Sequence, residues 1–409
     1  TLIMEIGGVT PGSQYDQIQA SGAVGIDGTL SLQLINGYVP PPTQQFTMLA
    51  HASRVGMFAN IAGYTISGSQ AFAVHYTNTA ATAIAGQWQH PALSGIIDVP
   101  GPKLDVTGSG AWSGTLIKRG AGAMEVNLGS SSVASGAMLN VQAGSLVLKT
   151  DVGATDANLS LQVNGGSATF ESSQHLASLD VANGRTATLA ANVNRVLVTP
   201  LLDLHATGKL DLKDNKLIVR TTPIGTWDGS AYTGVAGLVD AGRGNASNAQ
   251  WDGNGIVTSD TRAANNNDLT SIGVIDASDK FPGGETATSL FAGQTVTGAD
   301  TLVMFTWGGD ANLDGKINID DYGQIDFNVG SSGSVFGWYN GDFNYDGKIN
   351  IDDYGIIDFN VTAQTGTFPT AGGAEGELDG VVAVPEPASL GLLALGAAGL
   401  MGRRRRRCN

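Results

Sequence analysis

The chain has 409 residues, of which 58 are glycine and only 14% are charged. This length suits roughly two to four domains, and so much glycine with so little charge is typical of many short strands joined by turns. The formal net charge is −15, and five of the 21 basic residues lie in one run near the end, which argues against a nucleic-acid partner. The single cysteine, Cys408, excludes an intramolecular disulfide.

Residues 1–95 alternate apolar runs with glycine and proline turns, which predicts a β-rich region. The order of these runs resembles the last rungs and end cap of repeat-built bacterial surface proteins of the autotransporter-passenger type. The sequence begins at Thr1, not at a methionine, and is already strand-like there. We therefore expect an upstream part, including any export signal, to be missing.

Residues 96–220 contain about twelve short apolar runs, whose starts lie about ten residues apart. That spacing suits either a two-sheet sandwich or a stacked solenoid. Trp112 and Phe170 are the only aromatic residues between 104 and 219, whereas a core between two sheets usually recruits more large rings. A narrow lumen of Leu, Val and Ala needs none, so the pattern favours a right-handed parallel β-solenoid (β-helix). The stretch also resembles the autotransporter-associated β-strand repeats.

Residues 221–307 are richer in Asn, Gly and Asp and are predicted to form a loop-rich β connector. Residues 308–362 then hold two copies of a 22-residue stretch, starting at Gly309 and Gly341, that differ at four positions. Each copy offers oxygen atoms at alternate positions of a twelve-residue loop with glycine at position six, as calcium requires. The sequence therefore predicts two Ca²⁺ ions. The predicted ligands are Asp310, Asn312, Asp314, Lys316 (through its carbonyl), Asn318, Asp321, Asp342, Asn344, Asp346, Lys348 (through its carbonyl), Asn350 and Asp353.

Apolar residues follow each loop at helical spacing, as in Tyr322, Ile325 and Val329 of the first copy. A loop with an exit helix, duplicated over residues 308–361, resembles the type I dockerin repeat, which docks enzymes onto cohesin domains in cellulosomes. The resemblance implies a small α-helical calcium module and a cohesin-like partner. However, Ile319-Asp320 and the matching pair of the second copy replace the partner-reading residues of cohesin-binding dockerins. A calcium-rigidified spacer, or a module that only caps the solenoid, therefore stays open.

Residues 363–383 are a Gly, Ala and Thr linker, predicted to be flexible. Residues 384–409 read as a Pro-Glu-Pro turn, an uncharged apolar run over 388–402 and a basic cluster. A helix over that run is shorter than the hydrocarbon core of a bilayer, which suits a segment that is inserted and then removed. The positive-inside rule keeps the arginines cytoplasmic and places the preceding chain outside the inner membrane.

This tail resembles the PEP-CTERM sorting signal of exported proteins of Gram-negative bacteria. The resemblance implies export, processing by an exosortase, and delivery to the cell surface or extracellular matrix. It also implies transient or retained inner-membrane anchoring by a C-terminal hydrophobic helix. The matching residues are Pro385, Glu386, Pro387, Arg403, Arg404, Arg405, Arg406 and Arg407.

No catalytic motif stands out, and the five histidines are scattered without metal-ligand spacing. A glycosidase needs two carboxylates close together, which Glu171, Asp180, Asp203 or Asp211 could supply if the fold joins them. The sequence favours a non-catalytic exported surface or matrix protein, displayed through the calcium module. The alternative is a cellulosome-like component that binds or degrades polysaccharide, as a glycan hydrolase or lyase, and docks to a cohesin.

Overall fold

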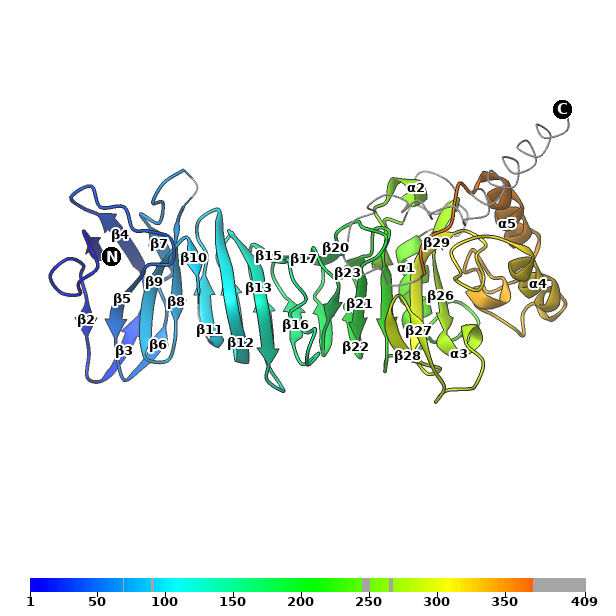
Figure 1. Ribbon diagram of the computed structural model, residues 1–409, viewed down its shortest axis with the longest axis horizontal. Helices are drawn as coiled ribbons and strands as arrows, with labels where there is room; N and C mark the ends of the chain where they lie inside the picture. The colour runs from blue at the N-terminus through cyan, green and yellow to red at the C-terminus, as the bar shows by residue number, and fades with distance from the viewer. Residues whose placement is uncertain (69, 90–91, 245–250, 265–267, 371–409) are drawn as a thin grey trace, which may run out of the picture. The chain divides into compact units, whose positions relative to one another are not determined.

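Parallel pairing between successive strands dominates the structure (Figure 1). The computed structural model describes residues 1–68, 70–89, 92–244, 251–264 and 268–370. Among these described residues, strands make up 42% and helices 13%, and the parallel strands stack into a β-solenoid of about 6 turns. The prediction of a mainly β chain with a parallel solenoid is confirmed. The sandwich alternative is wrong, because a sandwich needs two packed antiparallel sheets.

Parallel rungs begin at the start of the chain, inside the region predicted as β-rich and likened to the last rungs and end cap of a repeat-built protein. The paired strands are β1 (Leu2–Ile6), β4 (Thr29–Leu34) and β7 (Asn60–Ala62), then β2 (Ile18–Gln19) with β5 (Gln45–Ala50), and β3 (Ala23–Ile26) with β6 (Ser53–Gly56). An antiparallel insertion follows, formed by β8 (Phe72–Tyr76) and β9 (Ala80–Ala85). This hairpin joins the first rungs to the main solenoid, because β9 pairs with β5 and β8 pairs with β11.

The main solenoid consists of three rows of stacked strands. The first row is β11 (Ala92–Asp98), β12 (Lys103–Arg119), β14 (Met138–Val141), β16 (Ser160–Val163), β19 (Ser178–Val181) and β22 (Leu201–Leu204). The second row is β10 (Gln87–Trp88), the start of β12, β13 (Ala123–Val133), β15 (Ser145–Leu148), β17 (Ser167–Phe170), β20 (Thr186–Leu189), β23 (Lys209–Asp211) and β25 (Gly255–Val257). The third row is β18 (Gln174–His175), β21 (Val196–Thr199) and β24 (Lys216–Val219).

The lumen is filled by every second side chain of these strands. Leu139, Leu161 and Leu179 lie in register on neighbouring rungs, and none has exposed surface. Asn140 and Gln162, which are 22 residues apart, point outward on the same two strands and share an amide hydrogen bond of 3.3 Å. A 22-residue rung with two strands accounts for the predicted ten-residue spacing. Full burial of each leucine stabilises the fold by roughly 1.5–3 kcal/mol.

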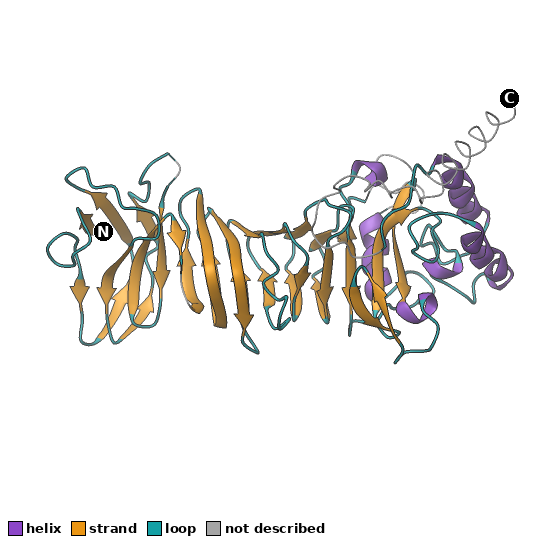
Figure 2. Cartoon of the chain, in the orientation of Figure 1, coloured by secondary structure: helices purple, strands orange, loops and turns teal. Residues whose placement is uncertain are grey.

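An antiparallel sheet ends the solenoid. β29 (Thr301–Trp307) pairs antiparallel with β24 on one side and with β26 (Thr270–Asp276) on the other. The predicted loop-rich connector also contains the hairpin of β27 (Thr288–Phe291) and β28 (Gln294–Thr297), and helices α1 (Gly234–Arg243), α2 (Thr261–Ala264) and α3 (Ala277–Lys280) (Figure 2). The sequence did not predict these helices. The glycines of α1 disfavour a helix, and α1 forms because Val235, Ala236 and Val239 are buried.

Helices follow both duplicated loops, as the apolar spacing predicts. They are α4 (Ile319–Asn328) and α5 (Ile351–Ala363), with short 3₁₀ turns at η1 (Val329–Ser331) and η2 (Trp338–Asn340). Within the described ranges, no helix is both long and apolar enough to cross a membrane. The predicted C-terminal helix, most of the 363–383 linker and the whole sorting signal lie outside the described residues.

Candidate metal centre in the duplicated loops

The first loop folds around a buried carboxylate. Asp310 has no exposed surface, and its Oδ1 accepts the Asp314 N–H at 3.0 Å while its Oδ2 accepts the Gly315 N–H at 2.9 Å. The hydroxyl of Thr306, on β29, also donates to Oδ2. Gly315 has a φ of +89°, which a residue with a Cβ rarely adopts. The glycine at position six is therefore required by the turn.

The second loop repeats this arrangement. Asp342 also has no exposed surface, and it accepts the N–H groups of Asp346 at 3.1 Å and Gly347 at 2.9 Å. Its outside donor is the hydroxyl of Tyr232, which lies just before α1. The Asn344 amide oxygen accepts the Asp346 N–H at 2.9 Å. The two loops thus have one backbone design and different external donors.

The aspartate at position twelve ties the start of each loop to its exit helix. Asp321 Oδ1 accepts the Ala311 N–H at 2.9 Å, and its Oδ2 accepts the Asn318 N–H at 2.8 Å. Asn318 in turn caps α4 by accepting the Asp320 N–H at 2.7 Å. Asp353 and Asn350 form the same capping box on α5. This reciprocal cap closes each loop against its own helix.

Burial makes the charged form of the innermost aspartates costly, and in the first loop the ammonium of Lys280 is a nearby cation. Burial, and then the neighbouring Asp321, raises the pKa of Asp310 to about 8. Burial likewise raises the pKa of Asp342 to about 6 and that of Asp353 to about 7. The Asn312 side-chain oxygen is buried without a hydrogen-bond partner. Buried oxygens with unpaired negative charge are the chemistry of a hard cation site, so the residues fit calcium.

The twelve predicted ligands do not form a finished coordination sphere. In the parts of the chain that the structure describes, no three His, Cys, Asp or Glu side chains converge on one metal position. The side-chain oxygens of Asn318 and Asn350 already accept hydrogen bonds as helix caps. At position nine of such loops a residue often binds calcium through a water molecule, and this is the role left to these two. The carbonyls of Lys316 and Lys348 remain the predicted ligands at position seven. The ligand set stays a prediction.

The two repeats hold each other through reciprocal contacts. The Tyr322 hydroxyl donates to Asp358 Oδ1 at 2.7 Å, and the Tyr354 hydroxyl donates to Asp326 Oδ1 at 2.5 Å. The glycines that open the two copies show the same exchange, because a Cβ on either would lie 2.9 Å from the isoleucine of the other helix. Those pairs are Gly309 with Ile357 and Gly341 with Ile325. Neither repeat is complete without its partner.

The loops are also part of the solenoid's end. The Tyr345 hydroxyl donates to the Ile272 carbonyl at 2.8 Å, and the Asn360 amide donates to the Asp268 carbonyl at 2.6 Å. The sequence did not predict these contacts, nor the roles of Thr306 and Tyr232, because all four partners lie outside the repeat. No local pattern marks them.

The first residues of the predicted flexible linker are ordered. The Gln364 side chain pairs with both backbone groups of Ile317, accepting from the N–H at 2.9 Å and donating to the carbonyl at 2.8 Å. Phe368 is buried against Phe305 and Trp307, with ring centroids 5.3 and 5.2 Å away. Burial of this one aromatic ring fixes a segment whose composition indicates flexibility.

The histidines do not gather into a site in the described residues. His175 is held by Asp151, with 2.6 Å between Nδ1 and Oδ2, and its Nε2 lies 2.8 Å from the Gln294 side-chain oxygen on β28. The hydrogen bond to Asp151 is the main cause that raises the pKa of His175. His51, His75 and His205 lie elsewhere on strands and turns, and His90 is outside the described residues.

This contact predicts a pH-dependent stability. The protonated form of His175 is favoured in the fold, so its contribution is complete below the unfolded pKa of about 6.5 and is lost as pH rises through the raised pKa. We expect the melting temperature to fall between about pH 6 and 8, and His175→Gln to flatten that slope. His205→Gln, at an exposed histidine, is the control. An unchanged slope in His175→Gln would contradict the assignment.

Of the four carboxylates considered for catalysis, the fold brings only Asp180 and Asp203 onto neighbouring strands. Asp180 and Asp203 face each other in register on β19 and β22, and Asp180 lies 3.1 Å from the Nε2 of His205. Asp211 instead accepts hydrogen bonds from Ser259 and Lys213 on another row. None of these three lines a cavity described for this chain. Glu171 follows β17 and is exposed.

The comparisons with known proteins bear on the tail. Residues 383–407 match the PEP-CTERM protein-sorting motif. The match includes the Pro-Glu-Pro turn and the arginine run, and it contains neither the duplicated loops nor the solenoid. No curated protein and no solved structure matches the chain. The motif implies that this β-solenoid protein is exported, processed by an exosortase and sorted to the cell surface.

Proposed function

We propose that the chain is a non-catalytic cell-surface or extracellular-matrix protein, in which the solenoid is displayed through a calcium-stabilised loop pair and sorted by the C-terminal tail. The sorting motif at residues 383–407 is the observation that carries this proposal. The solenoid supports it, because stacked rungs build a long, regular outer surface suited to display. Sorting by this tail requires transit through the inner membrane, and calcium is available outside the cell at concentrations that fill weak sites.

Two bound Ca²⁺ ions are part of the proposal. Asp310 and Asp342 would supply the innermost carboxylates, with the amide oxygens of Asn312 and Asn344 beside them. Calcium supplies positive charge to these buried oxygens when bound. The loops contact the last sheet, so we expect the ions to stabilise the solenoid end as well as the loops.

Surface display tests the proposed sorting. We expect deletion of 384–409 to abolish display of the chain in a host that carries an exosortase, while the protein is still exported and folded. Replacing Pro385, Glu386 and Pro387 with alanine should have the same effect, and the matched control replaces Glu377, Leu378 and Asp379, which precede the matched motif, with alanine. Display that survives the deletion would contradict the proposed function.

The alternative is a module that docks to a cohesin-like domain, with the solenoid binding or degrading polysaccharide. Exposed apolar side chains at equivalent positions of α4 and α5 favour docking: Ile319 and Ile351 are 79% and 78% exposed, and Phe327 and Phe359 are 85% and 62% exposed. Gly323 and Gly355 leave open space between them. Calcium-dependent capture of a cohesin, lost in Phe327→Ser with Phe359→Ser, would support this alternative over a spacer. Reducing ends released from a polysaccharide panel would indicate catalysis.

A further inference from the structure

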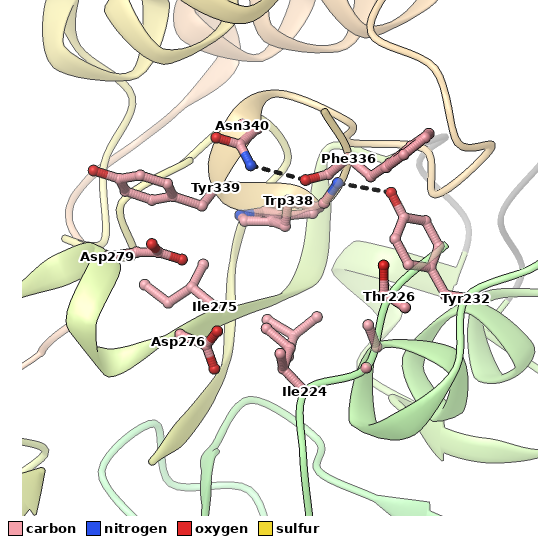
Figure 3. Close-up of a pocket in the computed structure, with 14 residues that line it drawn as sticks. Ile224, Thr226, Tyr232, Ile275, Asp276, Asp279, Phe336, Trp338, Tyr339 and Asn340 are labelled. Carbon is pink, nitrogen blue, oxygen red and sulfur yellow. Dashed lines mark hydrogen bonds between the residues drawn. The ribbon is translucent and has the colours of Figure 1, made fainter. Parts of the chain in front are cut away.

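A cavity of about 240 Å³ opens beside the last sheet of the solenoid (Figure 3). Its walls come from three segments that are distant in sequence: residues 224–236, the end of β26 with α3, and residues 336–340 before the second loop. The Tyr232 hydroxyl accepts the Gly337 N–H at 2.7 Å and thereby fixes two of these walls to each other. The cavity is therefore built by the same packing that positions the duplicated loops.

Two carboxylates that lack an ion-pair partner among the described residues line this cavity. Asp276 and Asp279 stand at the turn where β26 passes into α3, and neither forms an ion pair with any described residue. The nearby Lys280 ammonium instead donates to the carbonyls of Asn312 and Leu313, at 2.7 and 3.1 Å. Burial, and then Asp279 and Glu285, raises the pKa of Asp276 to about 6. The cavity thus offers two carboxylates that no described cation pairs with.

The remaining walls are aromatic and apolar. The Tyr339 ring lies on the same side of the cavity as Asp279, and Ile224 and Ile275 form the apolar part of the wall near Asp276 (Figure 3). Aromatic faces attract cations, and their flat surface also packs against the C–H face of a sugar ring. A bare metal ion would use only the carboxylates. A neutral sugar would use only the ring and leave the negative charge unpaired.

We propose that this cavity binds an amino sugar with a free ammonium group, held between Asp276 and Asp279 with its ring against Tyr339. The volume is below the usual range of roughly 300–1,000 Å³ for ligand pockets, so one sugar unit fits and a run of polymer does not. The site would let a matrix protein contact a polysaccharide that carries amino groups. It uses no predicted calcium ligand, so it stands apart from the calcium proposal.

Calorimetric titration of the full chain with three small sugars tests the site, at a calcium concentration that fills the loops. We expect glucosamine to bind at least about tenfold more tightly than N-acetylglucosamine or glucose, since only glucosamine carries the ammonium. Asp276→Asn and Tyr339→Ala should each weaken glucosamine binding by about tenfold or more. Asp203→Asn, which removes an exposed carboxylate of the solenoid, is the matched control and should bind as the unchanged chain does.

Four results would overturn the proposal: no glucosamine binding, equal binding of the three sugars, full binding by Asp276→Asn, or displacement of glucosamine by additional calcium. The last would assign the two carboxylates to a metal ion. Melting curves show whether each variant is folded, and Asp279→Asn replaces Asp276→Asn if the latter is not. The sugar test uses variants of Asp276, Asp279 and Tyr339, none of which is a predicted calcium ligand, so its result is read separately from that of the loop variants.

Discussion

Calcium should bind the full chain at two sites and raise its melting temperature by on the order of 10 °C when present at about a hundred times its dissociation constant. Each site filled to that extent adds about 2.7 kcal/mol to the free energy of unfolding. For a large domain, each kcal/mol corresponds to roughly 2 °C. The effect is large because Asp310 and Asp342 are fully buried, where a bound cation stabilises the charged form of each carboxylate. Calorimetric titration and melting curves with and without a chelator measure it.

A matched pair of variants in the second loop separates metal binding from folding. Asp346 accepts only the Lys348 N–H, at 2.9 Å, and an asparagine keeps that bond. We therefore expect Asp346→Asn to weaken one of the two calcium sites about tenfold or more, with little change in the melting temperature in chelator. Asp352→Asn removes an equal charge from an exposed position of the same loop and should leave both sites intact. Equal affinities in the two variants would contradict the predicted ligand set.

Truncation of one lumen side chain should destabilise the solenoid by about 2–5 kcal/mol. Leu161 has no exposed surface and lies between Leu139 and Leu179 on the adjacent rungs. Leu161→Ala leaves a cavity that these neighbours cannot fill, because each is held in place by its own ladder of backbone hydrogen bonds. Each rung contacts only the rungs next to it, so a weakened rung also reduces the cooperative unfolding of the rungs before it with those after it. Denaturant unfolding of the full chain gives the free-energy difference.

Gln162→Ala is the control for this prediction, because Gln162 is the next residue on the same strand and faces outward. We expect it to cost only the amide hydrogen bond to Asn140, about 1 kcal/mol or less. Similar losses in both variants would show that the lumen does not hold the solenoid together.

The spacing of the apolar runs and the scarcity of aromatic residues were enough to favour the solenoid over a sandwich. Strands such as Ser160–Val163 bury every second residue, as a narrow lumen requires. The spacing could not reveal that Lys118 lies in the lumen row, in register with Val141. Its ammonium donates to the carbonyls of Gly120, Gly122 and Ala143, and burial lowers its pKa to about 8. A charged residue in a short run gives no sign that distant carbonyls will surround it.

Within the duplicated loops, local sequence likewise predicted the turns and the helices that follow them, but not their contacts with the rest of the chain. The positions of the glycines and the capping residues follow from the repeat itself, as in Asn318 and Asp321. Contacts from outside the repeat, such as Tyr232 to Asp342 and Phe368 to Trp307, depend on how the chain returns to the solenoid end. The amino-sugar cavity belongs to this second class, because its walls come from three separate segments.

The register of the rungs fixes how such a chain can change its length. Strands in a sheet lie about 4.8 Å apart, so adding or removing one 22-residue rung would move the hydrophobic layers by one such spacing and keep every lumen side chain aligned. An insertion or deletion of a few residues within a strand does not preserve this alignment, because it turns lumen side chains outward. Lengths of related chains should therefore differ in whole steps, while the loops and the sorting tail stay constant.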